Sequence, residues 1–319
     1  MKLALVGGRG YTGAELLALL ASHPSLDLAF ASSTSQAGTP VAAACPAWRG
    51  TEDFVALTPD GVAARAADAW VLAVPNGAAA EWAAAIGDAH PEAVIVDLSA
   101  DHRFDGDWTY GLPERYRDAL RQARRIANPG CYATGAQLAL LPLLDRLEGT
   151  PEIFGVSGYS GAGRKPSPNN DPERLRDNLL PYRLAGHVHE REISAQLGRA
   201  VRFMPHVAAF FRGISLTLSL RLSEPTSPAR LQTRFEAHYE KEPRVIVQEA
   251  IPDVRSVQGT PDCRIGGFTV DERDRRRITL VAVLDNLLKG AASQAMQNLN
   301  LALGLDEQLG IDTRYTHHD

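Results

Sequence analysis

Short apolar runs alternate with amphipathic stretches along the first part of the chain. Four of these runs have the length of buried strands and end at turn residues, at positions 2–6, 26–33, 70–74 and 94–98. Residues 14–21 show the helical spacing of apolar side chains, and His23 and Pro24 stop this helix. Strands that alternate with helices are typical of a parallel sheet.

The pattern changes in the middle of the chain. Residues 214–222 alternate between apolar and polar side chains, which is typical of a half-exposed antiparallel strand. Apolar runs predict further strands at 153–157, 245–247, 265–270 and 278–284. Leucines after Cys131 predict a helix that reaches Leu147 and bends at Pro142. Other helices are predicted to begin near His187, to span 231–239, and to run from Asp285 to about Leu303.

Together these elements predict an α/β protein of two domains. Residues 1–130 form a Rossmann-type domain with a parallel sheet, which a C-terminal helix at about 286–319 completes. Residues 131–285 form an α+β domain with a mixed sheet. The length of 319 residues suits two domains.

Composition limits the class of partner. Hydrophobic residues make up 45% of the chain and charged residues 22%, which is ordinary for a globular protein. The net charge of -5 gives no reason to expect nucleic acid or an anionic membrane as a partner, and no apolar run approaches a membrane span. Three widely spaced cysteines, Cys45, Cys131 and Cys263, argue against a disulfide framework and for the cytoplasm.

A glycine-rich turn follows the first strand. Gly7, Gly10 and Gly13 stand between that strand and the first helix, the context in which such glycines bind the pyrophosphate of a dinucleotide. The alternative is a turn that only joins strand to helix. The second strand ends at Ser33, Thr34 and Ser35 instead of a carboxylate, so that NADP is acceptable. Pro75 begins the turn after the third strand, where the same cofactor would lie in a doubly wound sheet.

Cys131 is the candidate nucleophile. It follows the turn Pro129–Gly130 at the start of a helix, where the helix dipole favours the thiolate. The alternative is a small buried hydrophobic residue. The two histidines His187 and His189 lack a further metal ligand at a supporting spacing, so we expect no metal and a general base for Cys131. They could also be surface histidines near a helix start.

Arg103 follows the carboxyl end of the strand at 94–98, where open α/β sheets bind ligands. Its planar fork suits an anion, although a structural salt bridge would explain it as well. The small residues around Ser160, Gly161 and Ala162 indicate a backbone that passes close to another group.

With these features the chain resembles the N-acetyl-gamma-glutamyl-phosphate reductase family, which is similar to aspartate-semialdehyde dehydrogenase. The resemblance spans nearly the whole chain and is carried by the motifs GGRGYTGAEL, DLSADHRF, YGLPE, NPGCYAT, SGYSGAGRK, GHVHEREI, MPHVAAFFRGI and DNLLKGAASQAMQNLN. It departs from the family's usual pattern at Val188, Arg191 and Thr34, where the family often has a basic residue, a proline and an arginine.

The resemblance implies a site and a reaction. Cys131 would be the thiol nucleophile and His189 the general acid and base. The substrate would be bound by Arg103, Asn128, Ser160, Arg164 and His187. The cofactor NADP(H) would be bound by Gly7, Gly10, Tyr11, Thr12, Gly13, Ser33, Thr34, Ser35, Pro75, Gly161, Ala162 and Asn286. The reaction would reduce N-acetyl-gamma-glutamyl phosphate to its semialdehyde through a cysteine thioester, in arginine biosynthesis. The resemblance also implies a cytoplasmic homodimer or homotetramer, with residues 131–285 as the catalytic and oligomerisation domain.

Three other functions remain open. The same chemistry could act on aspartyl phosphate or on an aminoadipyl phosphate bound to a carrier protein, although a carrier would favour a basic docking surface. A phosphorylating dehydrogenase of the glyceraldehyde-phosphate type would share the cysteine and the histidine but not the flanking motifs. An inactive nucleotide-binding sensor would have no need of Cys131, His189 and Arg103.

Overall fold

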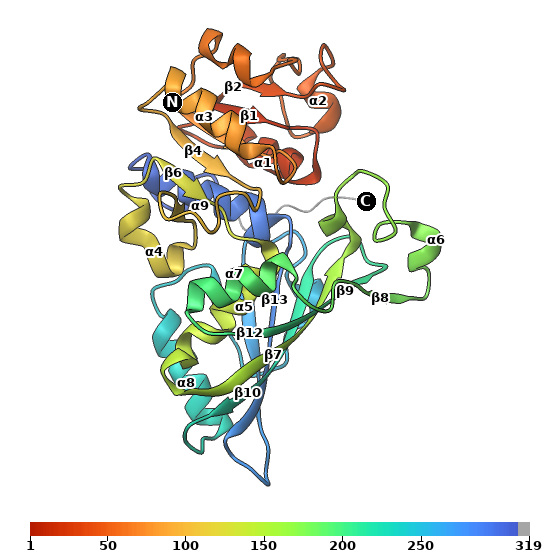
Figure 1. Cartoon of the computed structure of the whole chain (residues 1–319), viewed down its shortest axis with the longest axis vertical. Coiled ribbons are helices and arrows are strands. Elements are labelled where there is room, and N and C mark those ends of the chain that lie inside the picture. The colour runs from red at the N-terminus through yellow and green to blue at the C-terminus, as the bar shows by residue number, and fades with distance from the viewer. Residues whose placement is uncertain (312–319) are drawn as a thin grey trace. The chain divides into compact units, whose positions relative to one another are not determined.

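The computed structural model describes residues 1–311. The chain folds into two compact units (Figure 1). The first unit consists of Met1–Gly130 and of the described chain from Ala291 onward. The second unit is Cys131–Gly290. The chain therefore leaves the first unit directly before Cys131 and returns to it directly after Gly290.

The first unit is built on a six-stranded sheet in the order β2-β1-β3-β4-β6-β5. All neighbouring strands run parallel. The strands are β1 (Lys2–Val6), β2 (Asp27–Ser32), β3 (Ala69–Leu72), β4 (Val94–Asp97), β5 (Thr109–Tyr110) and β6 (Arg125–Ala127). The first four lie where the apolar runs predicted them. The last two have only two and three residues and are too short for a periodic pattern.

Helices complete the first unit, and of these only α1 and α9 correspond to predicted helices. They are α1 (Tyr11–Ala21), α2 (Val41–Ala44), α3 (Ala79–Ala89), α4 (Pro113–Leu120) and α9 (Ser293–Ala302), with the 3-10 helix η1 (Pro59–Ala64). Alanines of α3 pack on Val6, Trp70 and Ile95 from one face of the sheet. Helix α9 packs against α1, α4 and β4, so the returning chain contributes to this unit's core.

The second unit is built on a seven-stranded sheet in the order β11-β12-β13-β10-β7-β9-β8. The sheet is mixed, because β7 with β9 and β11 with β12 pair in parallel and the remaining pairs are antiparallel. Its strands are β7 (Leu147–Gly158), β8 (Leu179–Pro181), β9 (Arg202–Ala208), β10 (Ile214–Leu222), β11 (Val245–Val247), β12 (Cys263–Val270) and β13 (Arg277–Leu284).

Helix α5 (Cys131–Leu140) lies close against this sheet. A Cβ atom at Gly135 would come within 2.8 Å of the Leu216 side chain and closer still to Leu284. Other helices of the unit are α6 (Pro172–Leu175), α7 (Val188–Leu197) and α8 (Pro228–Tyr239), with the 3-10 turns η2 (Leu141–Arg146), η3 (Tyr159–Ala162) and η4 (Val254–Ser256). Helix α7 packs against α5.

Two predicted helices were wrong in their bounds. The helix after Cys131 ends at Leu140, because Pro142 has no N–H for the helical ladder, and Leu147 begins β7 instead of ending the helix. The last helix does not begin at Asp285, whose carboxylate accepts the N–H groups of Leu287 and Leu288. A single π-helical turn, η5 (Leu288–Ala292), follows before α9. The chain returns to the first unit at Ala291, and positions 312–319 of the predicted range lie outside the described residues.

None of the helices within residues 1–311 combines the length and the apolar character that a membrane crossing needs. Over the same residues, no group of three or more His, Cys, Asp or Glu side chains could hold a metal ion.

Candidate active site

Three glycines shape the turn after β1, each for a different reason. Gly7 has a φ of 86°, and a Cβ atom there would collide with the carbonyl oxygen of Ala73. A Cβ at Gly13 would lie 2.6 Å from the carbonyl oxygen of Gly8, so this glycine allows α1 to approach the turn. A Cβ at Gly10 would meet nothing nearer than 4.0 Å. The protein's own packing therefore does not require glycine at position 10.

The first turn of α1 is open to an anion. Gly10 is the N-cap of α1, no side chain caps the helix, and no acidic residue lies in its first turn, which includes Tyr11 and Thr12. Helix N-termini attract phosphate through N–H groups and the helix dipole. The structure therefore fits the pyrophosphate of a dinucleotide at this turn, with Gly10 leaving room for close approach.

The sheet order supports the same position. Strand β1 lies between β2 and β3, so the chain winds outward from it in both directions, and ligands bind at such a switch point beyond the carboxyl ends of the strands. Ser32 ends β2 and accepts hydrogen bonds from Gly7 and Gly8. Ser33 is buried, whereas Thr34 and Ser35 are exposed. Pro75 is exposed in the loop that follows β3.

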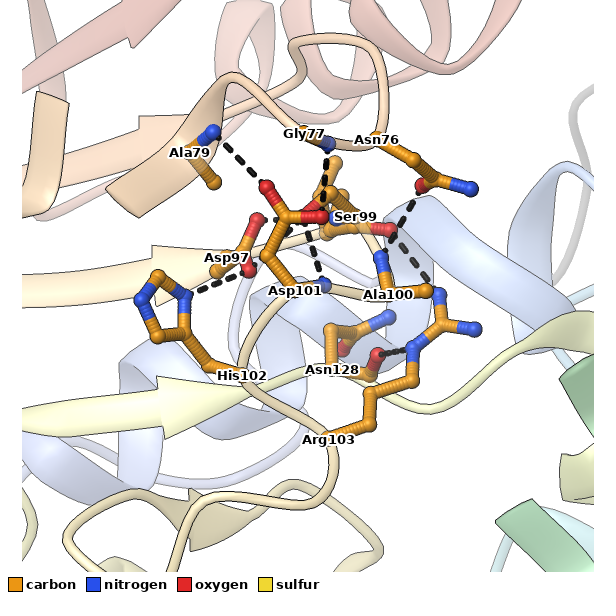
Figure 2. Close-up of polar contacts among 11 residues, drawn as sticks. Asn76, Gly77, Ala79, Asp97, Ser99, Ala100, Asp101, His102, Arg103 and Asn128 are labelled. Carbon is orange, nitrogen blue, oxygen red and sulfur yellow. Dashed lines mark hydrogen bonds and ion pairs between the residues drawn. The ribbon is translucent and has the colours of Figure 1, made fainter. Parts of the chain in front are cut away.

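A buried network organises the loop that follows β4 (Figure 2). The Asp97 carboxylate is fully buried and accepts hydrogen bonds from the Ser99 N–H at 2.8 Å and the Ser99 hydroxyl at 2.9 Å. The same carboxylate lies 2.8 Å from Nδ1 of His102, whose ring stacks on Trp108 with centroids 3.9 Å apart. The loop is therefore fixed from inside before it reaches Arg103.

Arg103 is buried and aimed by backbone carbonyls. Its Nε donates to the carbonyl oxygen of Asn128 and its Nη2 to that of Leu98, both at 3.0 Å. The Asn128 side chain in turn accepts from Nδ2 of Asn298 at 2.9 Å, so α9 holds the segment that holds the arginine. A guanidinium fixed in this way keeps a defined orientation.

The same loop is tied to the loop after β3. Asp101 accepts hydrogen bonds from the backbone N–H groups of Gly77 at 2.7 Å and Ala79 at 2.9 Å, which caps α3 from outside that helix (Figure 2). The Asn76 side chain accepts from the N–H of Ala100 at 3.0 Å. These contacts join the loop that contains Pro75 to the loop that contains Arg103. Asp101 belongs to the motif DLSADHRF, but the motif alone did not indicate that Asp101 links the two loops.

Cys131 is the first residue of α5 and is partly exposed. The π-helical turn η5 passes directly beside it, since a Cβ at Gly290 would lie 2.7 Å from the Cβ of Cys131. Glycine at 290 is thus required by the close approach of the two segments. The position at a helix N-terminus favours the thiolate form of Cys131.

His187 and His189 lie at the start of α7, and both rings contact Tyr132, the residue after Cys131. The ring centroids of Tyr132 and His189 are 5.7 Å apart, and those of Tyr132 and His187 are 6.5 Å apart. His187 is the N-cap, and its Nδ1 accepts a hydrogen bond from the His189 N–H at 3.1 Å. Burial, and secondly Arg183, lower the pKa of His187 to about 4, so this ring is neutral near pH 7.

Tyr182 belongs to the same group, although no sequence motif pointed to it. Burial, and secondly the nearby Cys131 side chain, raise the pKa of Tyr182 to about 12. Its ring lies 5.6 Å from that of His187 between centroids. The phenol therefore stays protonated and can donate a hydrogen bond close to Cys131. No spacing pattern in the sequence marks an isolated tyrosine on the chain ahead of α7.

Asn286 and Ser160 form one buried contact. The Asn286 amide donates to the Ser160 hydroxyl at 2.9 Å and accepts from the Gly213 N–H at 2.6 Å, which fixes the orientation of the amide. Asp285 anchors the adjacent backbone through a buried ion pair with Arg212 at 2.5 Å. Gly161 follows Ser160 in η3, and a Cβ there would lie 3.2 Å from the Ser157 hydroxyl, which is a tight contact. Gly161, Ala162 and Arg164 are exposed.

The predicted site residues thus fall into two groups, one in each unit. The first unit holds Gly7, Gly10, Tyr11, Thr12, Gly13, Ser33, Thr34, Ser35, Pro75, Arg103 and Asn128. The second holds Cys131, His187, His189, Ser160, Gly161, Ala162, Arg164 and Asn286. Pairs that the structure brings into direct contact are Arg103 with Asn128, His187 with His189, and Ser160 with Asn286.

Two family descriptions match the chain. Residues 2–123 match "Semialdehyde dehydrogenase, NAD binding domain", and residues 131–286 match "Semialdehyde dehydrogenase, dimerisation domain". A protein of Xanthomonas campestris pv. campestris named N-acetyl-gamma-glutamyl-phosphate reductase is 52% identical over 309 residues, which are 97% of this chain and 98% of that protein. The chain belongs to the N-acetyl-gamma-glutamyl-phosphate reductase family. A protein of the same name from Stenotrophomonas maltophilia is 53% identical, with 97% of each chain covered.

Solved structures agree in fold. Aspartate semialdehyde dehydrogenase II of Vibrio cholerae has a TM-score of 0.78 at 19% identity, covering 95% of this chain and 98% of that one. Aspartate semialdehyde dehydrogenase with NADP from Candida albicans has a TM-score of 0.69 at 15% identity, covering 94% and 97%. The predictions of the family, of the α/β fold with a mixed-sheet second part, of an oxidoreductase and of the nicotinamide cofactor NADP(H) are confirmed.

Proposed function

We propose that the protein reduces N-acetyl-gamma-glutamyl phosphate to N-acetylglutamate 5-semialdehyde, with NADPH as reductant and phosphate as the second product. The observation that carries this proposal is the thiol of Cys131 at the start of α5, which lies beside Gly290 and close enough to Tyr182 to affect the pKa of that phenol. The relatives that bear this enzyme's name match the chain over almost their full length.

Cys131 is the covalent nucleophile. Its thiolate, favoured by the N-terminus of α5, attacks the acyl carbon, so that a carbon–sulfur bond forms and the carbon–oxygen bond to phosphate breaks. Phosphate leaves and a thioester remains on the enzyme. Backbone N–H groups in the first turn of α5 are suited to stabilise the oxyanion that precedes this loss.

His189 moves the proton. It accepts the Cys131 proton before attack and returns a proton to sulfur when the semialdehyde departs. His187 is assigned to positioning, because its Nδ1 is engaged by the His189 N–H and burial lowers its pKa to about 4, which makes the ring a weak base. Since Nδ1 is engaged, His187 would bind the substrate, as predicted, through Nε2.

The cofactor fits the first unit at the glycine turn. Gly7, Gly10 and Gly13 with Tyr11 and Thr12 would hold the pyrophosphate at the start of α1, and Pro75 would border it from the loop after β3. Ser33, Thr34 and Ser35 would face the adenosine ribose, and Gly161, Ala162 and Asn286 would serve the nicotinamide end. When bound, NADPH supplies the hydride that the thioester carbon accepts.

We assign substrate recognition to charged and polar side chains. Arg103 would bind the leaving phosphate through its fork, since the carbonyls of Leu98 and Asn128 fix the guanidinium in place. Ser160 accepts a hydrogen bond from Asn286, so its own proton is available to a substrate oxygen. Exposed Arg164 would bind a substrate carboxylate.

The test is the reverse reaction with N-acetylglutamate 5-semialdehyde, phosphate and NADP, beside aspartate semialdehyde and aminoadipate semialdehyde as controls. We expect turnover with the acetylated glutamate compound alone. Cys131→Ser should bind NADP without turnover, and Arg103→Leu should raise the KM for phosphate while NADP binding is kept. Comparable turnover with either control substrate would favour the same chemistry on another acyl phosphate.

We also propose that the protein is a homodimer or homotetramer of the cytoplasm, assembled through its second unit. The family description of residues 131–286 as a dimerisation domain supports the assembly. Three free thiols, Cys45, Cys131 and Cys263, support a reducing compartment.

A further inference from the structure

The glycine turn holds one cationic residue, Arg9, between Gly8 and Gly10. Its side chain is exposed, and among residues 1–311 it forms no ion pair and no side-chain hydrogen bond. Pyrophosphate binding at such a turn uses backbone N–H groups and the helix dipole, and it needs no arginine. Arg9 is therefore a charge without an assigned role at the edge of the proposed cofactor site.

The backbone brings this turn to the end of β2. The N–H groups of Gly7 and Gly8 donate to the carbonyl oxygen of Ser32 at 3.2 and 3.0 Å, and Val6 pairs with Ser32 in the parallel ladder. Arg9 is the next residue after these contacts. In Rossmann-type domains the adenosine ribose lies at the end of the second strand, so that its 2′ position is within reach of an arginine side chain here.

The charges around this position suit a phosphate. A carboxylate at the end of the second strand would select the free 2′-hydroxyl of NAD. Here β2 ends at Ser32, and the chain continues with Ser33, Thr34 and Ser35. Thr34 and Ser35 are exposed and offer hydroxyl donors. A 2′-phosphate carries about two negative charges, which a guanidinium can pair with two parallel hydrogen bonds.

Neither neighbour of Arg9 could take its place. A Cβ at Gly8 would lie 3.0 Å from the Phe54 ring, so that position is packed inward. Gly10 is the N-cap of α1, where a side chain would occupy the space proposed for the pyrophosphate. We propose that Arg9 binds the 2′-phosphate of NADP(H) and sets the preference for NADPH over NADH, an inference that rests on the proposed use of NADPH.

Binding of cofactor fragments tests this role apart from catalysis. Isothermal titration calorimetry would compare 2′,5′-ADP with 5′-AMP on the full-length wild type, Arg9→Gln and Arg9→Lys. Arg9→Gln should weaken 2′,5′-ADP binding about tenfold or more, the usual effect of losing charge-assisted hydrogen bonds, and leave 5′-AMP unchanged. Arg9→Lys should fall between the two, because it keeps the charge and loses the fork. Arg121→Gln, which removes an exposed arginine at the end of α4, is the matched control and should change neither.

Two results would overturn the inference: equal binding of 2′,5′-ADP by wild type and Arg9→Gln, or an equal loss for both fragments. Turnover with NADPH and NADH separates this failure from that of the proposed function. If the wild type prefers NADPH and Arg9→Gln keeps the same preference, only the role of Arg9 is wrong. If the wild type turns over NADH equally well, the proposed cofactor preference itself is wrong.

Discussion

His187 and His189 stand two residues apart, yet their surroundings suit them to different tasks. His187 is buried, caps α7 and has a pKa lowered to about 4 chiefly by burial. A ring with a pKa near 4 is a weak base, and its Nδ1 already accepts the His189 N–H, so His187 is poorly suited to take up a proton from a thiol. His189 is partly exposed in the first turn of α7 beside Tyr132, and this leaves it as the better general base.

Replacing each histidine by asparagine separates the two tasks. His189→Asn should lower kcat by ~10²–10⁴, the range for loss of general acid–base catalysis. His187→Asn should have a much smaller effect, because asparagine also caps a helix and can accept the same N–H. Steady-state kcat at saturating NADPH and acyl phosphate would measure both, and a larger loss in His187→Asn would reverse the assignment.

The glycines in the turn between β1 and α1 are not all required for the same reason. Gly7 and Gly13 are needed by the fold, since a side chain at Gly7 would collide with the backbone of Ala73 after β3 and one at Gly13 with the backbone of Gly8. Gly10 is not, because its φ of -61° suits any residue and a Cβ there meets nothing nearer than 4.0 Å. A glycine that the fold does not need points to a ligand that approaches the backbone closely.

Gly10→Ala should therefore affect binding and not stability. The free energy of unfolding should stay within about 0.5 kcal/mol of the wild type, while the KM for NADPH rises roughly tenfold or more through displacement of the pyrophosphate. Gly106→Ala is the matched control, since a Cβ there also meets nothing within 4 Å. Urea unfolding and NADPH titration would be run on both variants. Gly10→Ala with normal affinity would argue that the dinucleotide does not lie at this turn.

The cap of α7 makes stability depend on pH. The pKa of His187 is lowered from 6.5 to about 4 in the folded protein, so below pH 6.5 the unfolded chain binds a proton that the folded chain does not. Stability should fall as the pH falls through that window, on the order of 2 kcal/mol between about pH 7 and about pH 5 for this group. His187→Asn keeps a capping side chain that does not titrate, so its loss over the same interval should be smaller. Urea midpoints at both pH values would measure the difference, and parallel losses in the two proteins would refute it.

At the scale of the whole molecule, the long periodic elements could be predicted and the short ones could not. β1 to β4, β10 and α8 have apolar patterns over several residues, and each lies near its predicted position. β5, β6 and β8 are two or three residues long and gain their place from neighbouring strands. The helix after Cys131 was predicted too long because its leucines continue into η2 and β7, and only Pro142 marks the break.

The reacting groups that we propose could be singled out in the sequence, whereas the residues that support them could not. Cys131, His189 and Arg103 are recognisable from residue type and position in a motif. Asp101, Asp97 and Tyr182 are not, because their roles come from contacts to segments distant in sequence: Asp101 caps α3 and Asp97 holds His102 inside the Arg103 loop. Such contacts need the fold to bring loops together, and no spacing along the chain encodes them.

The face of the second sheet opposite α5 is the surface on which we expect subunits to meet. Leu216 points toward α5, so by alternation Thr217 and its ladder partner Phe154 point to the other face. Phe154 is 37% exposed, packs on the His206 ring with centroids 4.4 Å apart, and pairs with Met204. These apolar side chains in neighbouring strands are better suited to a protein interface than to water.

A carboxylate at Phe154 should therefore disrupt the assembly. Phe154→Glu should shift the mass in solution toward the monomer and raise the dissociation constant about tenfold or more, because a charge buried at an interface without a partner is costly. Ile251→Glu is the matched control: it adds the same charge at an exposed apolar residue, 69% exposed, that lies outside the strands of the sheet. Light scattering coupled to size-exclusion chromatography over a dilution series would measure both variants. If Phe154→Glu keeps the wild-type mass at every concentration while it remains folded, the subunits meet on another surface.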